Sequence, residues 1–368
     1  MALVVVLAGG GTGGHIFPAL ALAEAIRKRE PDAHVRFVGT ERGLETRYVP
    51  TAGYALDLVP SAAVTGRGVA RGLLGLLVLA RGTLRARRLL RDLDADLVIG
   101  VGGYASVPAV AAALTLRIPT ALLEPNARPG RSNRVLGRYA RRVFVAFEDA
   151  IPFFPPGRAL LTGRPVRAMP RALGRANGGK LRLVITGGSQ GARAINRAVC
   201  AALPRLVSVP GLEITHQTGA ADLEETRAAY AAAGMRAELA AFFDDLPARL
   251  ARADLVVARA GSTVAELCQA GVASLLVPYP FAADDHQLAN ATELERAGAC
   301  TVVPDAELAT RFEAELLALL SDAPRRTRMG EAALLRAKPH AAEEIWAQCR
   351  TLLALDTKGR AAPSGGAR

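Results

Sequence analysis

The residues best suited to chemistry stand in two glycine-rich stretches, each of which follows a short apolar run. GGGTGGH at Gly9–His15 follows Val4–Ala8, and GGSQGAR at Gly187–Arg193 follows Leu181–Thr186. Glycine allows a tight turn and a close approach to the N-terminus of the next helix, where unpaired N–H groups favour phosphate or a developing negative charge. We therefore expect two loops that bind an anion or a sugar.

Two polar residues follow another predicted strand. Glu124 and Asn126 stand directly after Thr120–Leu123. Open α/β sheets bind their ligands at the carboxyl ends of their strands, so both residues are candidates for a binding site. A turn or capping role for Asn126 is the alternative.

A third candidate loop precedes the predicted helix Val264–Ala270. Ser262 and Thr263 stand before this helix, and Glu266 falls in its first turn. Thr263 is a suitable N-cap, and the helix N-terminus is able to hold phosphate. The Glu266 carboxylate is placed to accept hydrogen bonds from sugar hydroxyls.

The elements that position these loops alternate between strand and helix patterns along the chain. This alternation predicts the α/β class, with parallel sheets covered by helices on both faces. At 368 residues the chain exceeds what one hydrophobic core usually supports. We expect two domains, 1–162 and 163–340, followed by a helix over 341–356 and a disordered tail over 357–368.

One segment departs from this alternation, because no acidic residue occurs between Leu58 and Arg91. Its leucines and arginines include Leu73, Leu76, Leu77, Arg81, Arg85 and Arg88. A basic, amphipathic helix of this kind is able to lie in a membrane interface, with leucines at the acyl boundary and arginines on lipid phosphates. A core helix with a solvated arginine face fits the pattern equally well.

Composition narrows the classes of partner. The net charge of +12 suggests an anionic partner, either nucleic acid or a membrane surface. Nucleic acid is disfavoured because only 5% of the residues are aromatic and no stacking motif is present. The four cysteines lack C-x-x-C spacing, and no metal-ligand constellation stands out, so we expect reduced thiols and no metal.

No membrane-targeting segment is expected. Met1–Ala8 is apolar but lacks a basic region and a cleavage-like site, so it is interpreted as a strand rather than a signal peptide. No apolar run approaches the roughly 20 residues that span a bilayer. We therefore expect a peripheral rather than an integral membrane protein.

Seven motifs, in order, resemble those of the bacterial N-acetylglucosaminyltransferases that form lipid II, and the resemblance covers residues 2–355. The motifs are GGGTGGH (9–15), GVGGY (100–104), GRPVR (163–167), GGSQGAR (187–193), FFDDL (242–246), RAGSTVAE (259–266) and DDHQLANA (284–291). The resemblance implies a GT-B fold, in which two Rossmann-like domains face across a cleft and the last helix returns to the first domain.

The resemblance also implies a donor, an acceptor and a location. The donor is UDP-N-acetylglucosamine, and the acceptor is an undecaprenyl-diphospho-muramoyl-pentapeptide. The enzyme would act peripherally at the cytoplasmic face of the inner membrane, without a cofactor. The first domain would face the acceptor and the membrane, and the second would bind the donor. The family's donor contacts fall on Thr12, Gly13, Gly14, Asn126, Arg167, Ser189, Phe243, Ser262, Thr263, Glu266 and Gln287.

The chemistry of these residue types agrees with the implied roles. Arg167 and the helix N-termini supply positive potential for a diphosphate, so no metal is needed to stabilise the leaving group. The backbone at Phe243 is able to read the uracil edge. Glu266 is suited to ribose hydroxyls and Gln287 to the sugar.

The sequence departs from the family pattern at three places. Leu123 and Pro125 stand where the family usually has histidine and glutamine, and Arg164 replaces a usual asparagine. The loop Arg259–Thr263 is one residue shorter than usual, which makes Ser262 the least secure of the expected contacts.

The implied reaction is an inverting transfer. The muramoyl 4-hydroxyl attacks the anomeric carbon, and His15 is expected to be the general base, with Glu124 as the alternative. His15 could instead cap or orient the turn. Two other functions stay open: a UDP-sugar epimerase or hydrolase of the same fold, and a basic membrane-binding scaffold without catalysis.

Overall fold

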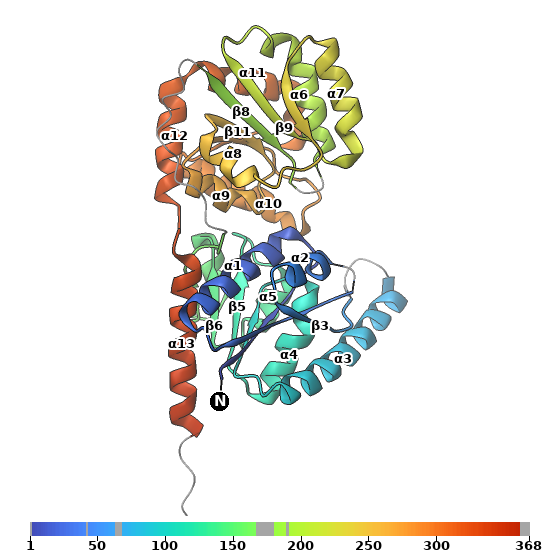
Figure 1. Cartoon of the computed structure of the whole chain (residues 1–368), viewed down its shortest axis with the longest axis vertical. Helices are drawn as coiled ribbons and strands as arrows, with labels where there is room; N and C mark the ends of the chain where they lie inside the picture. The colour runs from blue at the N-terminus through green and yellow to red at the C-terminus, as the bar shows by residue number, and fades with distance from the viewer. Residues whose placement is uncertain (1, 42, 63–67, 167–179, 189–190, 361–368) are drawn as a thin grey trace, which may run out of the picture. The chain divides into compact units, whose positions relative to one another are not determined.

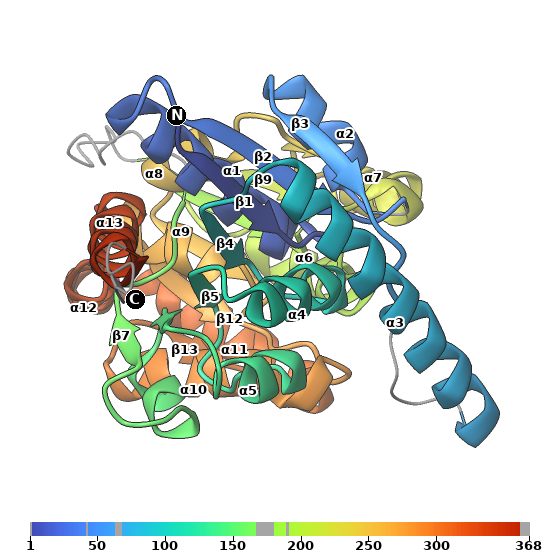
Figure 2. The same cartoon turned by 90° about the horizontal axis from the view of Figure 1, so that it is seen from below.

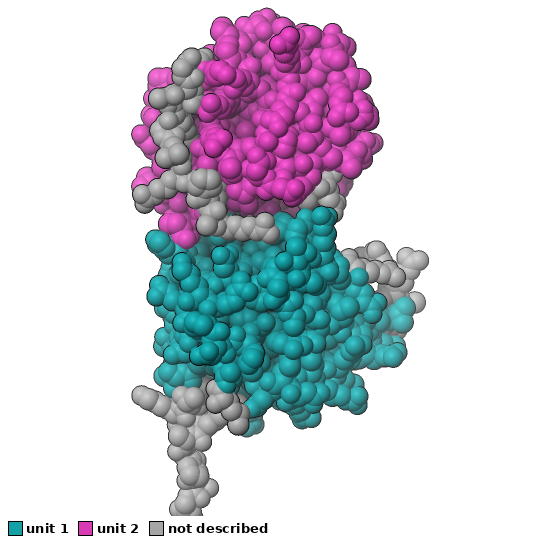
Figure 3. Space-filling view, in the orientation of Figure 1, with its two compact units in different colours: residues 1–167, 340–368 teal, residues 168–339 magenta. Residues whose placement is uncertain are grey.

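The computed structural model describes residues 2–41, 43–62, 68–166, 180–188 and 191–360, apart from the side chains of 68–73 and 356–360. The chain forms two compact units, residues 1–167 with 340–368 and residues 168–339 (Figure 3). The unit boundaries lie within a few residues of the expected domain boundaries. The last helix continues through Arg360, beyond its expected end at residue 356.

The first unit contains a parallel sheet of seven strands in the order β3-β2-β1-β4-β5-β6-β7 (Figure 1). Its strands are β1 (Val4–Ala8), β2 (His34–Gly39), β3 (Ala55–Leu58), β4 (Leu97–Gly100), β5 (Thr120–Glu124), β6 (Arg142–Val145) and β7 (Ala159–Leu161). The chain order reverses between β1 and β4, which pair directly. Ligands of open α/β sheets bind beside such a reversal, and here both strands lead into glycine loops.

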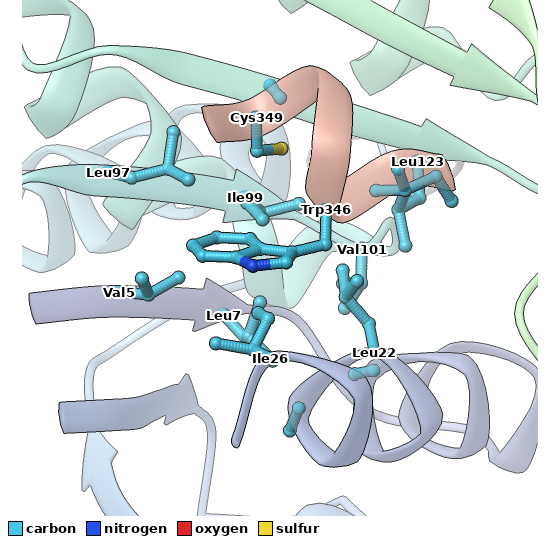
Figure 4. Close-up of a cluster of buried hydrophobic side chains, with 14 of the residues drawn as sticks. Val5, Leu7, Leu22, Ile26, Leu97, Ile99, Val101, Leu123, Trp346 and Cys349 are labelled. Atoms are coloured by element: carbon cyan, nitrogen blue, oxygen red, sulfur yellow. The ribbon is translucent and has the colours of Figure 1, made fainter. Parts of the chain in front are cut away.

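Helices cover both faces of this sheet: α1 (Gly13–Arg29), α2 (Glu45–Thr51), α3 (Gly68–Asp92), α4 (Val107–Leu116), α5 (Arg131–Leu136) and α13 (Ala341–Arg360). Successive strand residues point to opposite faces. Val5 and Leu7 of β1 therefore pack with α1 and α13, whereas Val6 and Ala8 pack with α3 and α4. Figure 4 shows Trp346 of α13 among Val5, Leu7 and other side chains of the first cluster.

The second unit repeats the design with six parallel strands in the order β10-β9-β8-β11-β12-β13. The strands are β8 (Leu181–Thr186), β9 (Leu212–Gln217), β10 (Ala237–Ala240), β11 (Leu255–Ala258), β12 (Ala273–Leu276) and β13 (Thr301–Val302). Its helices are α6 (Arg193–Leu206), α7 (Leu223–Ala232), α8 (Leu246–Arg252), α9 (Thr263–Ala270), α10 (His286–Arg296), α11 (Leu308–Ser321) and α12 (Ala323–Leu335).

The central strands β4 and β11 are short, continuous apolar runs, as expected of parallel strands that are covered on both faces. The predicted pair of parallel-sheet, Rossmann-like domains is confirmed. Among the residues that the structure describes, no helix combines the length and hydropathy needed to cross a membrane.

Candidate functional site

The first glycine loop places His15 in the first turn of α1, beside the second glycine loop of the same unit. The Thr12 hydroxyl and His15 Nδ1 share a hydrogen bond of 3.2 Å. A Cβ at Gly102 would lie 2.8 Å from the imidazole, and one at Gly103 3.4 Å from its Nδ1. Glycine at both positions, each with positive φ, therefore lets the loop after β4 approach the imidazole.

Glu124 ends β5 and is almost fully buried. Its Oε1 accepts hydrogen bonds from the Asn126 N–H at 3.0 Å and from Asn126 Nδ2 at 3.2 Å. Its Oε2 accepts from the Gly130 N–H at 3.2 Å and from Asn133 Nδ2 at 2.9 Å. Burial raises the pKa of the carboxyl to about 7, although these hydrogen bonds act in the opposite direction.

A recess in the first unit brings Gly14, Glu124 and Arg164 together. Arg164 is buried, and its guanidinium donates a hydrogen bond to the Gly14 carbonyl oxygen. Leu123 and Pro125 also line this recess. The first unit thus gathers Gly14, Glu124 and Arg164 at one edge of its sheet.

In the second unit, a side chain that the sequence did not single out links Phe243 to the glycine loop. Buried Gln217 ends β9, and its Nε2 donates to the Thr186 hydroxyl at 3.2 Å and to the Gly188 carbonyl at 2.9 Å. Its Oε1 accepts from the Phe243 N–H at 2.9 Å. The Phe243 N–H is therefore already bonded, and the Phe243 carbonyl oxygen accepts from the Leu246 N–H at 3.4 Å.

The α9 N-terminus differs in one detail from expectation. Thr263 was expected to cap the helix, but it is the first helical residue, and Ser262 takes the capping position without a side-chain hydrogen bond. Glu266 falls in the first turn, as expected. Gln287, near the start of α10, accepts a hydrogen bond from the Tyr279 N–H at 3.0 Å, and its Nε2 would lie 3.6 Å from a Cβ at Gly261.

Two expected donor contacts, Arg167 and Ser189, lie outside the described residues. Of the remaining ones, Thr12, Gly13, Gly14 and Asn126 belong to the first unit, whereas Phe243, Ser262, Thr263, Glu266 and Gln287 belong to the second. Within the described parts of the chain, no three His, Cys, Asp or Glu side chains are grouped to hold a metal ion.

Four leucines of the long helix α3 lie outward rather than in the core. Leu74, Leu76, Leu77 and Leu84 are 53 to 63% exposed. Leu77, Arg81, Leu84 and Arg88 follow one another at spacings of three and four residues, which places them on one face. The side chain of Leu73 lies outside the described part.

The opposite face of α3 is built of small residues. Gly75, Gly82 and Ala86 are buried, and a Cβ at Gly82 would lie 1.9 Å from the Pro60 carbonyl oxygen. This face therefore packs closely on its neighbours, and near the end of the helix Leu90 joins Ala86 in the core. Figure 2 shows the first turns of α3 extending past α4. The leucines at 74, 76, 77 and 84 are therefore not core residues, whereas Ala86 and Leu90 of the same helix are.

Two family models match the chain. Residues 5–145 match the glycosyltransferase family 28 N-terminal domain, and residues 182–345 match the glycosyltransferase family 28 C-terminal domain. Together they span both units.

Curated relatives and solved structures agree with these matches. Proteins of Anaeromyxobacter sp. (strain Fw109-5) and Myxococcus xanthus (strain DK1622) are 43% and 44% identical, over 95% of this chain and 93% of theirs. Both are named UDP-N-acetylglucosamine–N-acetylmuramyl-(pentapeptide) pyrophosphoryl-undecaprenol N-acetylglucosamine transferase. The crystal structure of Acinetobacter baumannii MurG has 30% identity and a TM-score of 0.78, covering 95% of this chain and 99% of that one. A putative UDP-N-acetylglucosamine 2-epimerase of Listeria monocytogenes, 15% identical with a TM-score of 0.69 and coverage of 95% and 96%, shares the fold.

Proposed function

The chain belongs to glycosyltransferase family 28, and we propose that it transfers N-acetylglucosamine from UDP-N-acetylglucosamine to an undecaprenyl-diphospho-muramoyl-pentapeptide. The products are lipid II and UDP. The observation that carries this function is the likeness to relatives of that name at 43 to 44% identity over 95% of the chain. The epimerase alternative has support from fold alone, because the epimerase structure is 15% identical.

The second unit binds the donor. The turn that begins α9 offers backbone N–H groups to the diphosphate, and Glu266 accepts hydrogen bonds from the ribose hydroxyls. Gln217 fixes the Phe243 backbone beside the glycine loop after β8, so the uracil and diphosphate contacts keep a set spacing. Gln287 bonds the sugar.

The first unit binds the acceptor and removes its proton. His15 accepts the proton of the muramoyl 4-hydroxyl as this oxygen attacks the anomeric carbon, and UDP leaves from the opposite face. The hydrogen bond with Thr12 and the packing of Gly102 and Gly103 orient the imidazole. Glu124, whose two oxygens already accept four hydrogen bonds, orders the Asn126 turn.

The exposed face of α3 holds the enzyme on the cytoplasmic surface of the membrane that contains its acceptor. Leu77 and Leu84 enter the acyl boundary while Arg81, Arg85 and Arg88 bind anionic headgroups.

One assay tests the function directly. The purified chain is incubated with radiolabelled UDP-N-acetylglucosamine and the lipid-linked muramoyl-pentapeptide in detergent, and lipid-bound label is counted. We expect label in lipid II only when the acceptor is present. Formation of UDP-N-acetylmannosamine without acceptor would support the epimerase instead, and binding to vesicles with no turnover of the donor would support the scaffold.

A further inference from the structure

A buried carboxyl group lies beneath the first glycine loop. Glu45, the first residue of α2, has no exposed surface. Its Oε2 accepts a hydrogen bond from the Gly11 N–H at 2.7 Å. Its Oε1 accepts from the Thr40 N–H and from the Thr40 hydroxyl, both at 3.0 Å. One side chain therefore joins the loop after β1 to the end of β2.

Three positions around the Glu45 side chain are glycine, and a Cβ at any of them would collide with it. A Cβ at Gly10 would lie 2.2 Å from the Glu45 carboxyl carbon, and one at Gly39 would lie 2.6 Å from its Cγ. A Cβ at Gly43 would lie 1.8 Å from Oε2. Three glycines from separate segments thus enclose one carboxyl group, and two of them, Gly39 and Gly43, lie outside the glycine loop itself.

We propose that Glu45 is a positioning residue for the transfer reaction, because it fixes the loop that carries His15. The inference rests on the proposed function. The Gly11 N–H donates to Glu45, and the hydroxyl of Thr12, the next residue, shares a hydrogen bond with the His15 imidazole. A shift of Gly11 therefore moves the imidazole relative to the acceptor hydroxyl. A misplacement of about 1 Å is able to cost roughly 10²-fold in rate.

Glu45→Gln tests the proposal with an almost isosteric change. The new amide group presents a donor to the N–H of either Gly11 or Thr40, so the side chain loses its bond to one of the two segments and no longer links the loop to the end of β2. We expect kcat to fall at least about tenfold, while the Kd for UDP, measured by calorimetry, stays within about twofold because the Glu266 and Phe243 regions belong to the other unit.

Asp96→Asn is the matched control. The Asp96 Oδ2 also accepts a backbone hydrogen bond, from Val4 at 2.8 Å, but at the amino end of the same sheet. We expect this variant to keep the wild-type kcat even where its loss of thermal stability equals that of Glu45→Gln. Equal losses of kcat in both variants, or a wild-type kcat in Glu45→Gln, would overturn the proposal.

A double-mutant cycle separates positioning from general destabilisation. If Glu45 acts through the His15 loop, Glu45→Gln has little further effect on kcat in a His15→Ala background. Full additivity of the two losses would contradict the proposal.

Hydrogen–deuterium exchange gives a readout that needs no activity. In Glu45→Gln the peptide over residues 9–17 is expected to exchange faster, with no change in the second unit. Unchanged exchange there would refute the role of Glu45, whereas absence of transfer by the wild type would refute the proposed function alone. Should Glu45→Gln fail to fold, Thr40→Val removes only the hydroxyl donor, and the same changes are expected at smaller size. Wild-type kcat and exchange in Thr40→Val would then count against the proposal.

Discussion

His15 lies in the first turn of α1 and Glu124 at the end of β5, and their hydrogen-bonding differs. Each of the two Glu124 carboxylate oxygens accepts two hydrogen bonds from the Asn126–Asn133 segment. Because these oxygens are already bonded within the protein, His15 is favoured as the base. We expect His15→Ala to lower kcat/KM by about 10²-fold or more, as is typical of acid–base catalysis, with UDP affinity retained. The pH profiles of kcat/KM for the wild type, His15→Ala and Glu124→Gln decide the matter. A His15→Ala enzyme within about tenfold of wild type, or loss of the acidic limb in Glu124→Gln, would move the role to Glu124.

The buried Glu124 carboxyl also makes stability depend on pH. Its pKa of about 7 in the folded state exceeds the usual 4.5, so the folded chain binds the extra proton between these values. The stabilisation is complete below about pH 4.5 and is lost as pH rises to about 7, by roughly 3 kcal/mol in total. Urea unfolding at several pH values, followed by the fluorescence of the single tryptophan, Trp346, should show this slope in the wild type and not in Glu124→Gln. If the free energy of unfolding depends on pH in the same way in the wild type and in Glu124→Gln, Glu124 is not the source of the slope.

Glu266 offers the clearest test of the donor side. We expect Glu266→Ala to raise the KM for UDP-N-acetylglucosamine about tenfold or more, since a hydrogen bond to a charged group contributes roughly 1.5–3 kcal/mol. The KM for the lipid acceptor should stay unchanged. Glu266→Gln keeps one acceptor oxygen, so its KM for UDP-N-acetylglucosamine should lie between those of the wild type and Glu266→Ala. Wild-type donor kinetics in a folded Glu266→Ala variant would remove this residue from the site.

Individual site residues were predictable where a glycine loop or a strand end marked them. His15, Glu124 and Glu266 were found in this way, because each follows a motif that ends a strand or begins a helix. Glu45 and Gln217 were not, because neither stands in a glycine motif. Their importance arises only when the fold brings Gly11, Thr40 and Phe243 to them from distant segments.

At the scale of elements, the apolar runs placed strands and helices with small errors at the ends. Leu181–Thr186 matches β8, and the predicted helix Val264–Ala270 matches α9 except that α9 begins one residue earlier. The orientation of α3 was not predictable, because its leucine and arginine pattern fits a buried and an exposed helix equally. Gly82 helps to decide the outcome, since a Cβ there would collide with the Pro60 carbonyl oxygen and its absence lets this face of the helix pack closely.

This orientation makes the membrane contribution of α3 measurable. Arg81, Arg85 and Arg88 are exposed, so changing all three to serine should weaken flotation with anionic liposomes, with a loss of roughly 1 kcal/mol for each arginine. Added salt should weaken the wild type in the same way. Arg87→Ser is the control, because Arg87 donates to the Thr115 hydroxyl at 2.9 Å and is only half exposed. Unchanged flotation of the triple variant would assign α3 no part in membrane binding.

At the scale of the whole molecule, the chain leaves the first unit and returns to it. The alternation of strands and helices predicted two domains, but the packing of α13 on α1 depends on contacts between residues more than 300 positions apart. The expectation of a returning helix came from the family resemblance, since no local pattern in 341–356 specifies its partner.

Because each unit has its own core, we expect a core mutation to lower the stability of its own unit only. Trp346 of α13 reports on the first unit. Ile345 of α13 and Leu319 of α11 are both fully buried, one in each unit. Ile345→Ala should cost the first unit about 2–5 kcal/mol and lower the midpoint of the Trp346 fluorescence transition. Leu319→Ala, with a comparable cost in the second unit, should leave that midpoint in place and instead lower the calorimetric transition that UDP raises. If both variants lower the Trp346 midpoint equally, the units unfold as one cooperative body.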